Sequence, residues 1–350
     1  MLASRALLVA ILVPLLAACA VSEPETDRAA DGATSVAVAQ TVPEPEFVLD
    51  TENTHNRFSR TVPPVLTVPS GAVVEVHTKE ASDGQLGPDS DAAALANLDF
   101  DPIHPLSGPI YVEGAQPGDV LAVTIHEVEL GEWGWVGVAP GFGFLADEFT
   151  EPYVETFRFT DGQTSVQFAD GRTVPLHPFP GVMGVAPDTD EMLSTIPPRR
   201  NGGNMDNKHL QPGTTVYFPV LVEGALFSVG DTHAAQGDGE VCGTAIEAPM
   251  RLVLELELRK GGRELPEPQY ENAELYATTG FAETLDEAAR KATRFMIDYL
   301  EAEHGMDRTD AYVLASLAGD LKIAEVVDVP HVLVAMHMPK SVLAGENGDM

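Results

Sequence analysis

The sequence is poor in cysteine and in positive charge. It contains two cysteines, Cys19 and Cys242, and if processing consumes the first, no intramolecular disulfide can form. Only 20 of its 350 residues are Lys or Arg, against 54 Asp and Glu, which gives a formal net charge of −34. Such a chain cannot offer a large basic surface to phosphates, so nucleic acids and anionic membrane surfaces are not expected partners.

The N-terminus lacks an apolar run of transmembrane length. The run from Ala6 to Leu16 is too short to span a bilayer, which indicates a signal peptide over residues 1–18. Leu16-Ala17-Ala18-Cys19 resembles a bacterial lipobox, which implies cleavage before Cys19 and lipidation of its thiol. A plain secretory signal with nearby cleavage is the alternative. We therefore expect a lipoprotein of the cell envelope, on the periplasmic side or in the outer membrane, which touches the membrane only through its lipid.

Composition changes after this leader. Residues 19–46 are rich in Ala, Thr, Glu and Pro without hydrophobic periodicity, which is typical of a flexible acidic tether. From Phe47 onward the chain consists of short apolar runs broken by glycine and proline. Its 44% hydrophobic content suffices for one large core or two smaller ones.

Short strands that follow glycine turns recur along the chain. One strand-and-turn unit occurs three times, with strands expected near Val73–His77, Val120–Ile125 and Thr215–Val220, and three copies of one hairpin device favour a β-sandwich or jelly roll. The string Val112-Glu113-Gly114-Ala115 returns as Val222-Glu223-Gly224-Ala225, which suggests duplication. The predicted fold is mainly β, with two related β-sandwich (jelly-roll-like) domains over residues 47–170 and 171–345 and a small C-terminal α/β element.

That C-terminal element contains the one long predicted helix. Thr284 and Glu287 form a capping box, apolar residues follow at helical spacing, and Gly305 ends the pattern. A second helix from Thr309 to about Ala318 leads into two strands. We expect this unit to pack on the second β-domain without a catalytic duty of its own.

Several loops are candidates for the wall of a pocket. Residues 177–187 and 194–207, the second of which includes Asn204, contain so many prolines and glycines that neither is expected to form a regular helix or a central strand. His104 precedes a strand in another loop, and both tryptophans lie in Gly131–Trp135. Aromatic residues in such loops line ligand sites or cap one end of a sandwich.

The segment Gly230–Glu247 concentrates the chemistry of the chain. Its ionisable side chains are Asp231, His233, Asp238, Glu240 and Glu247. Residues two apart on a strand point to the same face, so the first two should place a carboxylate beside an imidazole, which suits a metal or a general base with its orienting partner. The glycines at 237, 239 and 243 allow backbone amides to face a ligand as an oxyanion hole. A polar turn with a core histidine is the alternative.

The string Phe227–Glu247 closely resembles the signature of the acetamidase/formamidase family. Further segments are similar in the family's order: Val62–Leu66 with His55 upstream, Leu106–Leu121, Phe179–Pro187 and Gly202–Asp206. The resemblance extends from about Thr54 to Lys340. It implies hydrolysis of the C–N bond of small linear amides, such as formamide or acetamide, to ammonia and a carboxylate, and it suggests a homo-oligomer.

Two mechanisms are compatible with these residues. In the first, Asp231 and His233, with His55 or Glu247, hold a divalent metal, expected to be zinc, and Glu240 moves a proton to the leaving nitrogen. In the second, Cys242 is the nucleophile and Glu240 or His233 its base. The predicted catalytic residues are Glu240, Asp231 and His233; the predicted substrate-binding residues are Gln236, Gly237, Gly239, His104 and Asn204; and the predicted metal ligands are Asp231, His233, His55 and Glu247.

A non-catalytic β-sandwich lipoprotein that binds a solute is the competing class of protein. The density of ionisable groups in Gly230–Glu247 favours an enzyme, because simple binding does not require them together. The predicted export differs from the cytoplasmic amide assimilation associated with the family, so a larger environmental amide is a candidate substrate.

Overall fold

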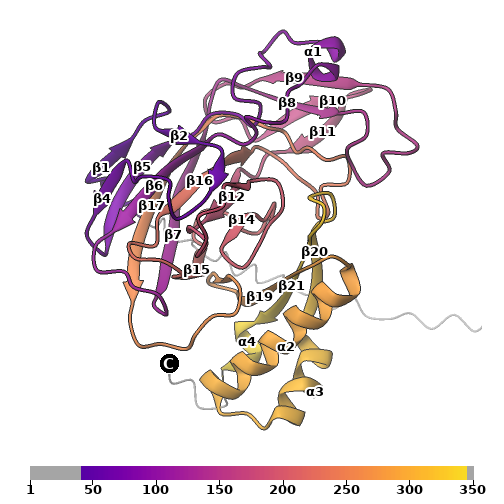
Figure 1. The fold of residues 1–350 in the computed structure, drawn as a ribbon. Coiled ribbons are helices and arrows are strands. Elements are labelled where there is room, and N and C mark those ends of the chain that lie inside the picture. The colour runs from indigo at the N-terminus through magenta and orange to yellow at the C-terminus, as the bar shows by residue number, and fades with distance from the viewer. Residues whose placement is uncertain (1–40, 345–350) are drawn as a thin grey trace, which may run out of the picture. The chain divides into compact units, whose positions relative to one another are not determined.

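The structure, a computed structural model, describes residues 41–344. The predicted signal peptide, the lipidation site Cys19 and most of the predicted tether lie outside these residues. From Val42 onward the chain forms one compact unit, in which two large β-sheets pack together and the helices α2 and α3 cover one end (Figure 1). Within residues 41–344, no helix has the length and apolar character needed to cross a bilayer.

The larger sheet has nine strands in the order β1-β5-β17-β7-β15-β18-β19-β21-β20. These are β1 (Phe47–Leu49), β5 (Ala72–His77), β7 (Val120–Leu130), β15 (Thr215–Pro219), β17 (Met250–Arg259), β18 (Gln269–Glu271), β19 (Leu275–Ala282), β20 (Asp320–Glu325) and β21 (Val332–Pro339). The strand that follows the sequence signature Phe227–Glu247 is β17, which pairs antiparallel with both β5 and β7.

The smaller sheet has six strands, in the order β14-β12-β16-β6-β2 with β4 on β6. They are β2 (Thr54–His55), β4 (Leu66–Val68), β6 (Leu106–Val112), β12 (Phe179–Gly184), β14 (Gly202–Asn204) and β16 (Phe227–His233). Three two-stranded ribbons are β3 (Arg57–Phe58) with β13 (Leu193–Ser194), β8 (Trp133–Val138) with β9 (Tyr153–Arg158), and β10 (Ser165–Phe168) with β11 (Arg172–Pro175). Every residue of β16 is buried.

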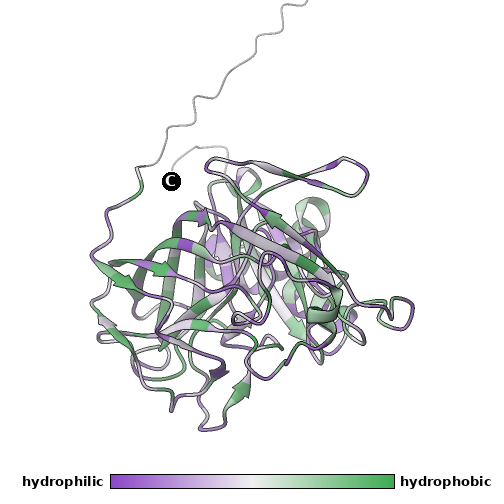
Figure 2. Ribbon diagram, turned by 90° about the horizontal axis from the view of Figure 1, so that it is seen from above, coloured by the Kyte–Doolittle hydropathy of each residue, from purple (hydrophilic) through white to green (hydrophobic). Residues whose placement is uncertain are grey.

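One apolar core lies between the two sheets. It joins side chains of the larger sheet, such as Ile125 and Leu254, to side chains of the smaller sheet, such as Ile110 and Val229, all of them fully buried. Each such side chain stabilises the fold by about 1.5–3 kcal/mol relative to exposure. Hydrophobic and hydrophilic residues mix along individual strands (Figure 2). This sandwich confirms the prediction of a mainly β fold.

The glycine turns carry the chain from one sheet to the other. β4 pairs with β6, whereas β5, which follows it in the chain, pairs with β1 and β17. The steps from β6 to β7 and from β15 to β16 also change sheet. The predicted strands are therefore confirmed, but their interpretation as hairpins is wrong, because a hairpin would leave both strands in one sheet.

The two copies of the repeated string lie against each other. The amide of Val112 donates to the carbonyl of Gly224 at 2.9 Å, and the amide of Gly224 donates to the carbonyl of Ala115 at 3.0 Å. Strands from both halves of the chain also share sheets, since β7 pairs with β15 and β17. The predicted boundary near residue 170 therefore does not separate two sheets.

The helices are α1 (Ala92–Ala96), α2 (Leu285–His304), α3 (Arg308–Ala318) and α4 (Lys340–Leu343). The long predicted helix is confirmed with both caps: the Thr284 hydroxyl accepts a hydrogen bond from the amide of Glu287, and Gly305 adopts φ 63°. Buried Ala292, Met296 and Leu300 pack α2 against the larger sheet.

Candidate active site

A cluster of carboxylates surrounds His233 at the end of β16. Its Nε2 lies 3.1 Å from Oε2 of Glu247 and 3.5 Å from Oδ2 of Asp231, and its Nδ1 lies 3.7 Å from Oδ1 of Asp206. None of these four side chains is more than 4% exposed. Removing so many carboxylates from water is unfavourable unless a positive charge compensates.

Strand alternation places the first two members as the sequence predicts. Asp231 and His233 point into the cluster, while the hydroxyl of Thr232 between them donates to the carbonyl of Ala248 at 2.6 Å and contacts the hydroxyl of Thr78 at 2.8 Å. Asp231 adopts φ 48°. Asp206, also in the cluster, and Glu240, on the same segment as Asp231, have positive φ values of 38° and 46°. Such conformations are strained for residues with a Cβ and concentrate at functional sites.

Gly181, on the neighbouring strand β12, makes room for the cluster. A Cβ on this residue would lie 2.5 Å from Oδ1 of Asp206 and 2.7 Å from Cε1 of His233. We expect Gly181→Ala to displace both side chains and to lower kcat/KM on any substrate of the site by at least about tenfold, since a misplacement of 1 Å costs up to 10²-fold. Steady-state kinetics on folded protein tests this. Gly262→Ala, where an added Cβ also meets nothing within 4 Å and which lies away from both cavities, is the matched control, and equal activities of the two variants would contradict the expectation.

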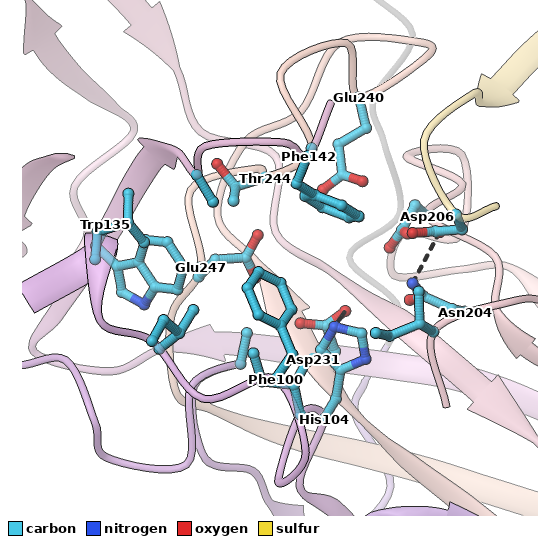
Figure 3. A pocket seen from close by; sticks show the side chains of 18 residues that line it. Phe100, His104, Trp135, Phe142, Asn204, Asp206, Asp231, Glu240, Thr244 and Glu247 are labelled. Carbon is cyan, nitrogen blue, oxygen red and sulfur yellow. Dashed lines mark hydrogen bonds and ion pairs between the residues drawn. The ribbon is translucent and has the colours of Figure 1, made fainter. Parts of the chain in front are cut away.

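A second group of polar residues faces the cluster. Nε2 of His104 lies 3.6 Å from Oδ2 of Asp231. The Asn204 amide donates to Oδ2 of Asp328 at 2.8 Å, the dashed line in Figure 3. Glu325 accepts hydrogen bonds from the amide of Asp328 at 3.2 Å and from that of the residue before it. The end of β20 therefore belongs to the site.

These groups line a small cavity of about 40 Å³, which has room for about two or three water molecules. Its polar wall is His104, Asn204, Asp206, Asp231, Glu240, Thr244, Glu247 and Asp328. Phe100, Trp135 and Phe142 contribute apolar lining beside these polar residues (Figure 3). A larger cavity of about 640 Å³ shares Glu240 and Thr244 with the small one.

Burial changes the protonation of the carboxyl groups. It raises the pKa of Glu247 and of Glu325 to about 8. Burial, with the charge of Asp206 beside it, raises the pKa of Glu240 well above its usual value. Burial also opposes the ionisation of Asp231, but the imidazoles of His104 and His233 outweigh it and hold the pKa of Asp231 below its usual range. The site thus offers both protonated and ionised carboxyls at neutral pH.

The residues fit a divalent metal. Asp231, His233 and Glu247 form one group with ligand atoms close enough to share an ion, and Asp206, His233 and Glu240 form another. Buried carboxylate atoms of these side chains, Oδ1 of Asp206 and Oδ1 of Asp231, have no hydrogen-bond partner. No lysine or arginine is among the residues that line the small cavity. Carboxylate oxygens and imidazole nitrogens are both ligands that divalent ions, zinc among them, use in proteins.

Other predicted residues lie elsewhere. His55 is not among the grouped ligands, because Nε2 contacts the hydroxyl of Ser228 at 2.8 Å and Nδ1 contacts the carbonyl of Arg57 at 2.8 Å. Gln236 contacts two residues of the cluster. Its Oε1 lies 2.8 Å from Nδ1 of His233, and its Nε2 donates to the carbonyl of Asp206 at 2.5 Å.

The predicted oxyanion hole is wrong for two of its three glycines. The amide of Gly239 donates to the carbonyl of Ala324 at 2.8 Å, and the amide of Gly243 donates to the carbonyl of Glu240 at 2.8 Å, so neither is a free donor. Gly237 and Cys242 line the larger cavity. The Cys242 thiol lies 3.3 Å from the carbonyl of Thr244.

Asp206, Glu325 and Asp328 were not predicted as site residues. Asp206 ends the segment that resembles the family, which was its only signal. Glu325 ends β20 and Asp328 follows it, in the C-terminal unit for which we predict no catalytic duty. The structure places this end of the unit at the site, because the amide of Gly239, in the segment Gly230–Glu247, pairs with β20.

A buried carboxylate cluster faces a small cavity in a β-sandwich. This combination of fold and site defines the class of the protein as a candidate enzyme. A model of the acetamidase/formamidase family matches residues 43–194 and 189–344, and the chain therefore belongs to this family. It is 32% identical to the acetamidase of Mycolicibacterium smegmatis over 60% of this chain and 67% of that protein.

Two further proteins support the assignment. The formamidase of Methylophilus methylotrophus is 27% identical over 82% of this chain and 89% of its own length. The crystal structure of the acetamidase from Bacillus halodurans superimposes with a TM-score of 0.80 at 34% identity, covering 84% of this chain and 98% of that one. Family membership and these names support amide hydrolysis.

Proposed function

We propose that the protein hydrolyses the C–N bond of small linear amides to ammonia and a carboxylate, with a divalent metal, expected to be zinc, held by Asp231, His233 and Glu247. The observation that carries the proposal is the set of buried, partnerless ligand atoms beside a cavity of substrate size. A metal bound there would act as a Lewis acid and make water a better nucleophile at neutral pH.

The chain's own residues position the amide and move the proton. The Asn204 side chain donates its N–H to Asp328 and has a buried Oδ1 without a partner, which suits an N–H of the substrate amide. Water adds to the carbonyl carbon and loses a proton, the C–N bond breaks, and the proton lost by the water restores the acid form of Glu240 after that residue has protonated the leaving nitrogen. The leaving nitrogen takes its proton from the carboxyl group of Glu240, whose pKa burial and the charge of Asp206 raise well above its usual value, and ammonia is released.

We expect ammonia release from formamide, acetamide or propionamide to fall by at least about 10²-fold after chelation and to return when zinc is added, since the ion supplies the nucleophile. The assay uses protein expressed from Ala20 onward, without the predicted leader. The metal content of this protein is measured by elemental analysis. Full activity in metal-free protein would contradict the proposed role of a metal in the reaction. Absence of release from any amide by folded, zinc-loaded protein would contradict amide hydrolysis and favour the solute-binding class.

A further inference from the structure

The small cavity has a wall that carries no free polar side-chain atom. This apolar wall is formed by Leu95, Leu98, Phe100, Trp135, Ala139 and Phe142. The one polar side-chain atom of this group, Nε1 of Trp135, donates to Glu80 at 2.9 Å, and Glu80 does not line the cavity. A ligand therefore meets only carbon on this side.

The apolar wall is closely packed. A Cβ on Gly137, which belongs to the same strand as Trp135, would lie 2.6 Å from Cδ2 of Leu95. The Leu95 side chain therefore has no free space on the side that faces this strand. Leu95 and Trp135 are each 2% exposed. A rigid wall of this kind limits size, because a larger ligand forces neighbouring side chains off their rotamers.

Two phenylalanines close the wall where it approaches solvent. Phe100, before β6, and Phe142, after β8, contact each other with ring centroids 5.9 Å apart and planes tilted by 58°. Phe100 is 40% exposed. Phe142 packs against the segment Gly230–Glu247, where a Cβ on Gly243 would lie 2.5 Å from its ring. Figure 3 shows both rings beside the carboxylates.

We infer that Phe142, supported by Phe100, sets the length of the acyl chain that the site accepts. The inference rests on the proposed function: with the amide group among Asp231, Glu240 and Glu247, the alkyl part of the substrate points at this wall. The two rings then discriminate among alkyl amides by the length of the acyl chain. A polar or charged acyl group would lose its hydration against carbon without gaining a partner.

The test is kcat/KM for the linear series from acetamide to hexanamide, measured as ammonia release with zinc-loaded protein. Phe142→Ala is expected to raise the ratio of hexanamide to acetamide by about 10- to 100-fold, because each methylene placed in an apolar pocket is worth tenfold or more in specificity. Phe142→Leu, a milder change, should shift the ratio in the same direction. Phe100→Ala should shift it less, since that ring is partly exposed.

Phe144→Ala is the matched control. Phe144 lies on the same loop, is 55% exposed and does not line the cavity, so its ratio should equal that of the wild type. Unchanged ratios in folded Phe142→Ala and Phe142→Leu that still hydrolyse acetamide would overturn the inference and leave the proposed function standing. A wild-type protein that hydrolyses neither formamide nor any member of the series would overturn both.

Discussion

Asp231→Asn is expected to lower kcat/KM for acetamide by at least about 10²-fold and to remove most of the bound metal. Oδ2 of Asp231 lies 3.5 Å from Nε2 of His233 and 3.6 Å from Nε2 of His104, and Oδ1 has no partner. The substitution keeps the shape of the side chain but removes its charge and one ligand oxygen. Even the loss of a residue that only supports a metal ligand costs 10- to 100-fold in activity or affinity.

Metal content and kinetics are measured on the same preparation. The control is Asp238→Asn, the same change on the same segment, where the carboxylate is partly exposed and lies 3.2 Å from Lys208 and 3.3 Å from His209. That ion pair is worth little, so activity and metal should stay near wild type. Asp231→Asn with full metal content and near-normal turnover would remove Asp231 from the proposed ligand set.

Local pattern predicted the centre of the site. The Asp231 and His233 pair follows from strand alternation, which the opposite orientation of Thr232 confirms. The α2 helix was predictable to its caps, because capping is a property of adjacent residues. These features depend on separations of a few residues, which a single sequence displays directly.

The remaining acidic residues of the site depend on the path of the chain between sheets. Asp206 and Asp328 line the same cavity as Asp231 only because β14, β16 and the end of β20 converge, and no spacing rule relates them. β12 shows the limit of composition, since Pro180 argued against a central strand, yet β12 lies between β14 and β16. That expectation was wrong because the other residues of β12 keep their register with β16 and tolerate one missing donor.

Residue type alone is also insufficient to predict that a histidine binds a metal, as His55 shows. His55 has the donor atoms of a metal ligand, but Ser228 and the carbonyl of Arg57 occupy both ring nitrogens. Burial lowers the pKa of His55 to about 4, which keeps it neutral at physiological pH and fits a structural role between β2 and β16. Its position beside the family segments gave no means to distinguish the two roles.

Glu240→Gln is expected to lower kcat for acetamide by about 10²- to 10⁴-fold, the usual contribution of a general acid. Glu240 is 6% exposed and lines both cavities, and burial together with Asp206 raises its pKa well above the usual value. The protonated form is the active one, so wild-type turnover should be full below this raised pKa and fall as pH rises through it. Glutamine cannot give up a proton, so that alkaline limb should disappear in the variant.

A substrate whose leaving group needs no proton separates this role from a structural one. Hydrolysis of p-nitrophenyl acetate expels a stable phenolate, so Glu240→Gln should retain most of its activity on this ester while it loses turnover of acetamide. Metal content should also stay at the wild-type level, in contrast to Asp231→Asn. Equal losses on ester and amide, or loss of the metal, would make Glu240 a ligand of the second group, with Asp206 and His233, and not the proton donor. The ester-to-amide ratio therefore decides which of the two buried carboxyl roles Glu240 holds.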